Sequence, residues 1–364
     1  MKVALVYDRI NKWGGAERVL LSLHKLFPKA PVFTSVYSPN NAKWAQGMDI
    51  RTSFLQKYPH AVDHHELYPF LMPMAFEKFS FAGYDLVISL TSEAAKGIIT
   101  QPGTKHICYC LTPTRYLWSG YKEYFKDPAL KILASPAISY LQKWDKVASK
   151  RPDKMVAISK EVQDRIKQYY NAESVIIYPP VDLEGLVTRD KRFSKSNKGK
   201  YFLIVSRLSK FTKYKRIDLA IQACNELKLP LKIIGEGNWK KELSGMAGPT
   251  VEFVGKVDDA TLKKYYLHCK ALLFPALEDF GLTVVEAQSF GKPVIAFRGG
   301  GATETIAEGK TGLFFNQQTK ESLIQALQLF DKMEFDEIVC RQNAKRFSTK
   351  QFTSSFLKLI KTVM

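Results

Sequence analysis

Short apolar runs alternate with helix-patterned segments along this chain, and no other feature of the sequence restricts its fold as strongly. Such alternation is typical of parallel β-sheets, because parallel strands have to be joined by crossover helices. The first series of predicted strands comprises residues 3–7, 32–36, 86–89, 107–110, 155–158 and 175–177. Helices are predicted at residues 17–27 and from Ser159 onward, where Glu161 lies in the first turn.

The alternation stops at Tyr178-Pro179-Pro180 and begins again at residue 201. Two prolines exclude a helix and a central strand there, and residues 191–200 are basic and poor in apolar side chains. The second series comprises predicted strands at 201–206, 231–234, 251–254, 271–274, 294–297 and 312–315, and helices at 216–227, 260–268 and 282–290. We therefore expect domains at residues 1–182 and 183–345, and a final helix within residues 346–364 that packs back toward the N-terminal domain.

Two such series predict an α/β protein with two Rossmann-like parallel-sheet domains, and 364 residues are enough for both. Ligands of these folds bind beyond the carboxyl ends of the strands. Two domains that face each other leave a cleft, which is a common place for a small-molecule site. Candidate functional residues are therefore expected directly after predicted strands.

The formal net charge of +19 indicates anionic partners. Nucleic acid, an anionic membrane surface and anionic small substrates all fit this charge, and so does a diffuse excess of solvated lysines. No run approaches the ~18 apolar residues that cross a bilayer, and the apolar N-terminus is too short for a signal peptide. We therefore expect a cytoplasmic protein that is neither secreted nor membrane-spanning.

The cysteine and histidine residues do not predict a metal site. The five cysteines are odd in number, and only Cys108 and Cys110 are close in sequence, within an apolar run that suits one face of a strand. Free buried thiols are expected. The Asp-His-His-Glu cluster at residues 63–66 is interpreted as a solvated loop, because nothing else of zinc-site spacing accompanies it.

Two glycine-rich or basic segments follow predicted strands. Gly14-Gly15-Ala16-Glu17 comes after the first strand and opens a helix, whose N-terminus favours an anion; an ordinary tight turn fits equally well. Arg207 follows the strand at 201–206, and Lys210, Lys213, Lys215 and Arg216 come close behind. Arginine grips phosphate with two hydrogen bonds and lysine acts as a point charge, so Arg207 is a candidate phosphate ligand.

The third segment runs from Glu278 to Glu286. Gly281 allows a tight entry into a helix whose first free N–H groups suit a phosphate. Glu278 is a candidate site residue or a helix-capping acid, and Glu286 lies about one turn beyond Thr283 on a helix expected to be buried. Buried glutamates are rarely unpaired, so a ligand hydroxyl is one partner that explains Glu286.

The fourth segment is Arg298-Gly299-Gly300-Gly301-Ala302-Thr303-Glu304, another glycine-rich turn after a strand. It is expected to pack beside the third segment. A helix entry with Thr303 or Glu304 as the capping group explains it equally well.

The stretch PALEDFGLTVVEAQSFGKPVIAFRGGGATETIAEGKTGLFF, about forty residues long, resembles the retaining GT-B glycosyltransferases of family 4. The hallmark of that family is two glutamates separated by seven residues, here Glu278 and Glu286. The segments YFLIVSRL, YKRIDLAI, GGAERVL, AISKEVQDRI and VIIYPPVD resemble further family segments, so the likeness covers nearly the whole chain.

The resemblance implies a role for each matching residue. Arg207 and Lys215 neutralise the diphosphate of a nucleotide-sugar donor. Gly14 and Gly15 meet the same phosphates from the other domain. Glu278 contacts the transferred sugar near its anomeric carbon.

Further donor contacts follow from the same resemblance. Glu286 binds the ribose, and Gly235 and Val257 flank the base. Backbone contacts to the sugar and the phosphate come from Phe280, Gly281, Leu282 and Thr283.

Two departures from the family pattern stand out. The loop between Arg207 and Lys215 is longer than is usual in the family, which leaves Lys213 and Lys215 as alternatives for the phosphate, with the YKRID segment favouring Lys215. Leu111 stands where the family often has a histidine that positions the sugar, so that role passes to Thr112 or Arg115, or the sugar preference changes.

The resemblance implies retaining transfer of a hexose, with a lean toward GDP-mannose, from a nucleotide-diphosphate sugar to a hydroxyl of a glycan or a polyprenyl-linked acceptor. No Asp-x-Asp metal motif is present, so no metal or cofactor is expected. Basic and aromatic residues at 66–81 and 116–150 suit an anionic membrane surface, on the inner face of the cell membrane, as well as an ordinary core. A nucleotide-sugar epimerase, a nucleic-acid-binding protein and an inactive scaffold are the alternatives; no nucleic-acid recognition motif is found.

Overall fold

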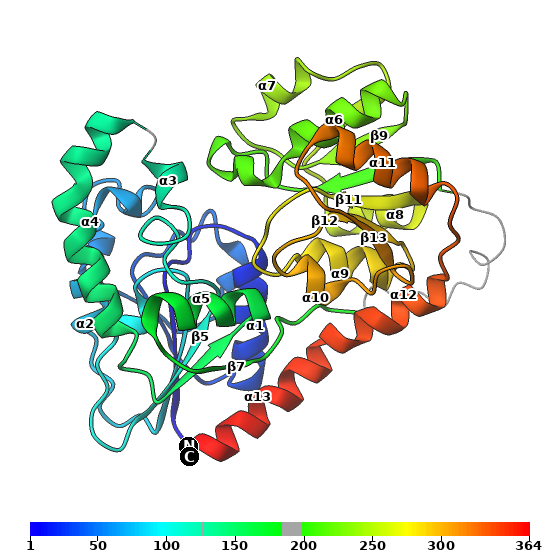
Figure 1. The fold of residues 1–364 in the computed structure, drawn as a ribbon. Coiled ribbons are helices and arrows are strands. Elements are labelled where there is room, and N and C mark those ends of the chain that lie inside the picture. Colours follow the sequence, from blue (N-terminus) through cyan, green and yellow to red (C-terminus); the bar gives the residue numbers. More distant parts are fainter. Residues whose placement is uncertain (126, 184–198) are drawn as a thin grey trace. The chain divides into compact units, whose positions relative to one another are not determined.

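The computed structural model describes residues 1–125, 127–183 and 199–364 (Figure 1). The chain divides into two compact units, Met1–Pro180 with Phe352–Met364, and Val181–Gln351. The division falls directly after Pro180, two residues before the predicted boundary. Most of the basic stretch at 191–200 lies outside the described residues.

The first unit is built on one parallel sheet with the strand order β3-β2-β1-β4-β5-β6-β7. Burial of the central strands on both faces explains their continuous apolar runs. The strands are β1 (Val3–Tyr7), β2 (Val32–Thr34), β3 (Ile50–Thr52), β4 (Leu86–Thr91), β5 (Lys105–Cys110), β6 (Lys154–Ala157) and β7 (Ser174–Ile176).

Helices and 3₁₀ turns connect the strands of the first unit. They are α1 (Gly15–Leu26), α2 (Leu71–Glu77), α3 (Tyr121–Tyr124), α4 (Pro128–Ala148) and α5 (Lys160–Tyr170), with 3₁₀ turns η1 (Lys43–Ala45), η2 (Phe54–Lys57), η3 (His65–Leu67) and η4 (Ala95–Gly97). Ser159 caps α5 as predicted, because its side chain accepts a hydrogen bond from the Val162 N–H at 3.1 Å. The sequence pattern does not predict α4, which contains Pro136 and apolar residues on two faces.

The C-terminal helix α13 (Thr349–Val363) lies within the predicted range of residues 346–364. Phe352, Phe356, Leu359 and Ile360 form its buried face. The rings of Phe352 and Phe356 lie 5.9 and 6.1 Å from the ring of Tyr109 on β5. The tail of the chain therefore packs on the first sheet, although it follows the second unit in sequence.

The second unit repeats the plan with a parallel sheet of order β10-β9-β8-β11-β12-β13. Its strands are β8 (Tyr201–Val205), β9 (Leu231–Ile234), β10 (Val251–Gly255), β11 (Cys269–Phe274), β12 (Val294–Phe297) and β13 (Gly312–Phe315). Its helices are α6 (Ile217–Glu226), α7 (Lys240–Ser244), α8 (Asp259–His268), α9 (Leu282–Ser289), α10 (Ala302–Thr305), α11 (Lys320–Phe330) and α12 (Glu337–Ala344), with 3₁₀ segments η6 (Lys210–Lys215) and η7 (Lys345–Phe347). The predicted α/β class with two Rossmann-like parallel-sheet domains is confirmed.

Several smaller expectations can be compared with the structure. All five cysteines are free and buried, and Cys108 and Cys110 lie on β5, as predicted. Across the described ranges, no three His, Cys, Asp or Glu side chains gather in a way that would hold a metal ion. None of the helices in the described part of the chain combines the length and the hydropathy needed to cross a bilayer.

Candidate active site

The second sheet reverses its strand order between β8 and β11, and the residues after these two strands form the candidate site. β9 lies on one side of β8 and β11 on the other, and ligands of open parallel sheets bind in the crevice at such a reversal. Arg207 lies two residues after β8 with an exposed side chain. Pro275 follows β11 and begins the loop that carries Glu278. Both predicted segments therefore lie at one edge of the sheet.

An ion pair joins these segments, because Nζ of Lys215 contacts Oε1 of Glu278. The backbone supports the pair, since the N–H of Leu277 donates to the carbonyl oxygen of Tyr214 at 3.4 Å. The two side chains are 13% and 22% exposed, so water screens their attraction only in part. An ammonium group has three N–H donors. Lys215 is therefore able to hold Glu278 and a phosphate oxygen at the same time.

The N-terminus of α9 lies directly after this loop. Gly281 caps the helix with φ of +89°, where a Cβ would come within 3.0 Å of the Phe274 ring. Phe280 is buried, and its ring packs edge-on against Phe347 at 5.5 Å. The first N–H groups of a helix have no partner inside it, and Leu282 and Thr283 are partly exposed. The backbone contacts of these residues with the sugar and the phosphate stay a prediction.

The glycine-rich turn after β12 packs against the same loop, as expected. The N–H of Gly301 donates to the carbonyl oxygen of Glu278 at 2.9 Å. A Cβ on Gly300, whose φ is +56°, would lie 2.2 Å from that oxygen, and one on Gly301 would lie 2.3 Å from Cα of Phe280. Only glycines allow this approach, so the turn fixes the backbone position of Glu278.

Glu286 lies on the buried side of α9 and is 7% exposed. The hydroxyl of Tyr266 on α8 donates to its Oε2 at 2.8 Å. The Tyr266 ring is itself stacked on Phe290, with centroids 5.3 Å apart and an interplanar angle of 10°. The sequence suggested a ligand hydroxyl as the partner of Glu286. In the structure the hydroxyl of Tyr266 bonds one of its two oxygens.

Gly235 and Val257, predicted to flank the base, lie near the ends of β9 and β10. Gly235 has φ of +138°, and a Cβ there would lie 1.8 Å from the carbonyl oxygen of Ser206. Its N–H donates to the carbonyl oxygen of Gly255 at 2.9 Å. Val257 is partly buried against the core of the second unit. Gly235 therefore lies next to the segment that carries Arg207, and the contact of both residues with a base stays a prediction.

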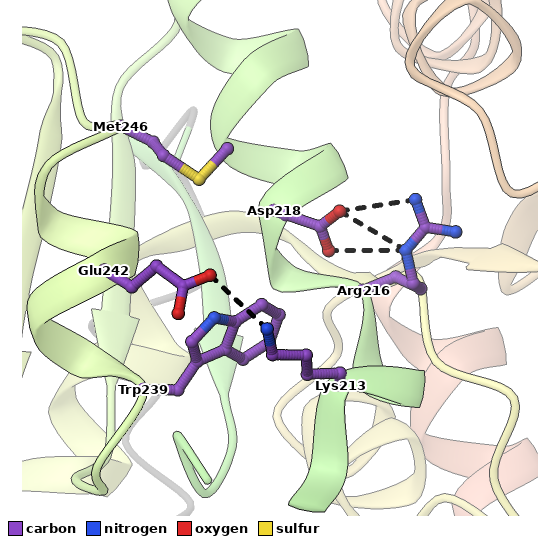
Figure 2. Close-up of a pocket in the computed structure, with 6 residues that line it drawn as sticks. All are labelled: Lys213, Arg216, Asp218, Trp239, Glu242 and Met246. Carbon is purple, nitrogen blue, oxygen red and sulfur yellow. Dashed lines mark hydrogen bonds and ion pairs between the residues drawn. The ribbon is translucent and has the colours of Figure 1, made fainter. Parts of the chain in front are cut away.

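Lys213 contacts a different set of residues from Lys215. Figure 2 shows its ammonium group beside Glu242, with Nζ 3.4 Å from Oε1, and it lies 5.3 Å from the ring centroid of Trp239. A pocket of about 290 Å³ opens here, lined by Lys213, Arg216, Asp218, Trp239, Glu242 and Met246. Lys215 and Glu278 do not line it. Of the two lysines that the sequence left as alternatives, Lys215 is the one beside Glu278.

In the first unit, Gly14 and Gly15 lie at the N-terminus of α1, as predicted. Gly14 is extended, with φ of −179°, and a Cβ there would meet only Oε2 of Glu17 at 3.1 Å. Glu17 is buried and accepts a hydrogen bond from the hydroxyl of Tyr7 at 2.6 Å; burial and this carboxylate raise the pKa of Tyr7. The contact of the two glycines with donor phosphates stays a prediction.

The first sheet reverses its strand order between β1 and β4, and charged residues gather after these strands. Asp8 accepts hydrogen bonds from the Thr91 hydroxyl at 2.9 Å and from backbone N–H groups of the loop after β4. Arg9 pairs with Glu93 at 2.8 Å, and His65 lies 3.6 Å from the other Glu93 oxygen. Burial alone would raise the pKa of Glu93, but Arg9 and His65 hold it below its usual value. Glu93 is therefore ionised.

Thr112, one of the predicted substitutes for the missing histidine, is already engaged. It is buried, and its hydroxyl accepts a hydrogen bond from Nη1 of Arg165 at 3.3 Å. Arg165 also pairs with Glu161 at 2.7 Å. Arg115 is partly buried, and its carbonyl oxygen accepts a hydrogen bond from Gly120 at 2.8 Å. A sugar-positioning role for Thr112 or Arg115 stays a prediction.

Comparison with protein families decides the identity of the chain. The model of the family described as glycosyl transferases group 1 matches residues 187–347. The model described as glycosyltransferase family 4 matches residues 13–184. The chain belongs to the family 4 glycosyltransferases.

Curated relatives agree with this assignment. An uncharacterized glycosyltransferase of Methanocaldococcus jannaschii is 26% identical over 56% of this chain and 57% of its own length. An alpha-1,3/1,6-mannosyltransferase of Dictyostelium discoideum is 32% identical over 30% of this chain and 28% of its own length. The chain spans about half the length of the curated relatives it matches first.

Solved structures identify the fold as GT-B. The structure of HepE from Anabaena in complex with UDP matches over 100% of both chains with a TM-score of 0.72 and 18% identity. Sucrose-phosphate synthase from Thermosynechococcus elongatus matches over 100% of this chain and 99% of its own, with a TM-score of 0.71 and 16% identity.

Sequence reasoning misses two features of this glycosyltransferase. The first is the contact of Tyr266 with Glu286. Two adjacent tyrosines, Tyr265 and Tyr266, look alike in the sequence, so the sequence does not show which of them meets Glu286. The other is a buried ion pair in the first unit, in which Nζ of Lys96 lies 2.5 Å from Oδ1 of Asp145 and both side chains are 1% exposed. Burial lowers the pKa of Lys96, but Asp145 outweighs this and raises it. Asp145 also accepts from Trp118 Nε1 and the Tyr170 hydroxyl at 2.7 Å, so it joins segments that are remote in sequence.

Proposed function

We propose that this glycosyltransferase moves a hexose from a nucleotide-diphosphate sugar to a hydroxyl of a glycan or a polyprenyl-linked acceptor, with retention of anomeric configuration. The observation that carries the proposal is the Lys215–Glu278 pair at the strand-order reversal of the second sheet, immediately before the N-terminus of α9. A cation and free backbone N–H groups suit the diphosphate of a nucleotide-sugar, and a carboxylate suits its sugar hydroxyls.

The leaving nucleoside diphosphate gains negative charge as the glycosyl–phosphate bond breaks. Lys215, Arg207 and the N–H groups at Leu282 and Thr283 would stabilise that charge as a preorganised electrostatic site. The helix dipole acts in the same direction. We also propose that these groups make a metal ion unnecessary, which predicts full activity in the presence of a chelator.

Retention would follow from attack on the same face of the sugar. The bond between the anomeric carbon and the phosphate oxygen breaks, the acceptor oxygen bonds to that carbon, and the acceptor proton passes to a leaving phosphate oxygen. Glu278 would contact the sugar hydroxyls beside this carbon. Its position depends on Gly300 and Gly301, whose close approach fixes the loop.

The nucleoside would lie further along α9. Glu286 would accept hydrogen bonds from the ribose hydroxyls in addition to the one from Tyr266, since a carboxylate has about four acceptor positions. HepE from Anabaena has been solved with UDP and with UDP-glucose, and the Dictyostelium relative is a mannosyltransferase. UDP-glucose and GDP-mannose are therefore the first donors to test.

The experiment is a panel of UDP-, GDP- and ADP-sugars. Donor binding is measured by thermal shift, since ligand at about 100 times Kd adds about 2.7 kcal/mol of stability. Transfer is measured as nucleoside diphosphate released with and without an acceptor, and the anomer of the product is assigned by NMR. Removing Lys215 (Lys215→Ala) is expected to lower kcat about 10²–10³-fold. Lys213→Ala is the matched control, because that side chain contacts Glu242 and Trp239.

Specific outcomes decide against the proposal. Equal activity of the Lys215→Ala and Lys213→Ala variants would show that Lys215 does not bind the diphosphate. Donor turnover to an epimer without any acceptor would identify an epimerase, and an inverted product anomer would refute retention. No response to any nucleotide-sugar, with a salt-sensitive shift of an oligonucleotide, would favour nucleic-acid binding.

A further inference from the structure

Helix α4 of the first unit is apolar on two opposite faces. Its inner face carries Ile138 and Leu141, which are 7% and 3% exposed and form a core cluster with Leu117. Its outer face, defined as Ile132, Pro136, Tyr140 and Val147, is exposed throughout. At about 100° per residue these four positions fall within an arc of about 80°, opposite the inner face. None of the four outer-face residues is buried where α4 docks on the first unit.

The exposure of the outer face is large for such residues. Ile132, Tyr140 and Val147 are 75%, 54% and 58% exposed. Single exposed apolar residues are ordinary on proteins, but a set aligned along one helix marks an interaction site. A solvent-facing helix surface is expected to be polar.

The turn before α2 extends this face. Phe70 at the N-cap of α2 and Met74 one turn later are 48% and 44% exposed. The Phe70 ring lies 6.2 Å from the ring of Tyr140, so the two elements form one surface, which we call the α2–α4 face. Helices α2 and α4 are labelled in Figure 1.

Polar contacts outside the apolar row hold α2 and α4 together. Nε1 of Trp144 on α4 donates to Oε1 of Glu77 on α2 at 2.8 Å, and Arg151 pairs with the same carboxylate at 2.7 Å. Gly97 makes room for the indole, because a Cβ there would lie 2.3 Å from the Trp144 ring. The α2–α4 face is therefore held in one arrangement by its own unit.

Two exposed lysines, Lys143 and Lys150, lie within the arc of these apolar residues, and no exposed acid lies beside them on α4. Lys131, Lys143, Lys146 and Lys150 are exposed. The single carboxylate in the sequence from residue 128 to residue 152 is Asp145, which is 1% exposed and paired with Lys96. The nearest exposed acids lie outside the two helices: Glu66 before α2, Asp127 before α4, and Asp153 after α4, where it pairs with Lys105 at 3.3 Å. The charge on the face is therefore positive.

We propose that the α2–α4 face docks this protein on the surface of an anionic lipid bilayer, with α4 lying in the plane of the interface. Interfacial helices combine lysines on their flanks with aromatic and aliphatic side chains that enter the headgroup region. Lysine stems are long enough to keep the ammonium in water while the apolar row is immersed. The cores of protein–protein interfaces are depleted of lysine, so charge and composition favour a lipid partner.

Vesicle co-sedimentation tests the proposal on the full chain. Wild-type protein is expected to sediment with vesicles of phosphatidylglycerol and phosphatidylcholine, to remain in solution with pure phosphatidylcholine, and to be released by high salt. Each lysine near an anionic surface contributes about fivefold to partitioning. The double variant Lys143→Glu/Lys146→Glu is therefore expected to bind at least about 25-fold more weakly.

The matched control lies on α13. Lys358→Glu/Lys361→Glu makes the same charge change on a helix whose apolar face is already buried. This control is expected to retain binding within about threefold, because charges remote from the docked surface are screened. The variant Ile132→Ser/Tyr140→Ser tests the apolar part at unchanged charge and is expected to lose most binding.

Three results would overturn the proposal: no sedimentation of wild-type protein at low salt, equal binding to neutral and anionic vesicles, or equal losses in the α4 and α13 variants. Self-association that Tyr140→Ser abolishes, without vesicle binding, would assign the face to a second copy of the chain. Unchanged circular dichroism and unchanged transfer to a water-soluble acceptor keep this test separate from the proposed catalysis.

Discussion

The position of Glu278 depends on the glycine turn after β12, and Gly300→Ala tests this dependence. A Cβ at residue 300 would lie 2.2 Å from the carbonyl oxygen of Glu278, whereas ordinary contacts begin at 3.4 Å. The obstructing atom belongs to the backbone, so no side-chain rotation relieves the clash. The two segments must therefore separate by about 1.2 Å. A misplacement of about 1 Å can cost about 100-fold in rate, or about 2.7 kcal/mol of transition-state stabilisation.

The same substitution also places alanine in a left-handed conformation, and that effect has to be separated. Gly309→Ala supplies the control, because Gly309 has a similar φ of +73° and a Cβ there would meet nothing within 4 Å. Both variants carry the left-handed penalty of about 1–2 kcal/mol, and only Gly300→Ala displaces Glu278. Gly309→Ala is therefore expected to lower Tm by about 2–8 °C and to leave kcat/KM within about threefold of wild type.

The assay is kcat/KM for the best donor in the panel, together with Tm and donor affinity for both variants. Gly300→Ala is expected to lose about 100-fold in kcat/KM while it remains folded. If Gly300→Ala keeps wild-type kcat/KM, or if Gly309→Ala loses as much activity, the turn does not position Glu278 and the reasoning is wrong.

Three further predictions concern side chains that sequence reasoning left unassigned. Tyr266→Phe is expected to raise the donor KM about tenfold with little change in kcat, because it removes the hydroxyl that orients Glu286, the carboxylate proposed to bind the ribose. Tyr265→Phe should not raise it, and a change in kcat alone would contradict the assignment. Asp145→Ala leaves a buried ammonium unpaired and should cost about 3–5 kcal/mol in urea unfolding, so a loss below about 1 kcal/mol would show that the pair is dispensable. Burial lowers the pKa of His106 to about 3, below its value of about 6.5 in the unfolded chain, so protonation favours unfolding as the pH falls. Stability should therefore decrease from about pH 6.5 toward pH 3 by up to about 1.4 kcal/mol per pH unit, and His106→Gln should flatten that slope; an identical pH profile for the variant would argue against it.

Local sequence patterns were sufficient for the framework of the fold. The strand at 231–234 and the strand at 294–297 have the predicted bounds, because a short buried parallel strand is continuously apolar and bordered by turn residues. Ser159 starts α5 because its hydroxyl satisfies a free backbone N–H, an effect that acts over a few residues. The strand-end position of Arg207 and the spacing of Glu278 and Glu286 likewise follow from the chain itself.

Helix α4 shows where local patterns fail. Apolar side chains occur on both of its faces and Pro136 interrupts the middle, so the 3.6-residue period that identifies an amphipathic helix is blurred. The same property exposes Ile132 and Tyr140 on the α2–α4 face. The apolar side chains on both faces of α4 therefore explain why the sequence does not predict this helix, and they also support the proposal that its outer face docks on a membrane.

The sequence by itself determined which residues follow which strands, because the order of residues is fixed by the covalent chain. Only the tertiary structure decided that Lys215, and not Lys213, pairs with Glu278, and that Tyr266 meets Glu286. These partners lie on elements about 20 to 60 residues apart, and crossover connections bring them together. Two lysines in one 3₁₀ turn, or two adjacent tyrosines in one helix, are alike in sequence, and their different directions become distinct only when the sheet and its covering helices are packed.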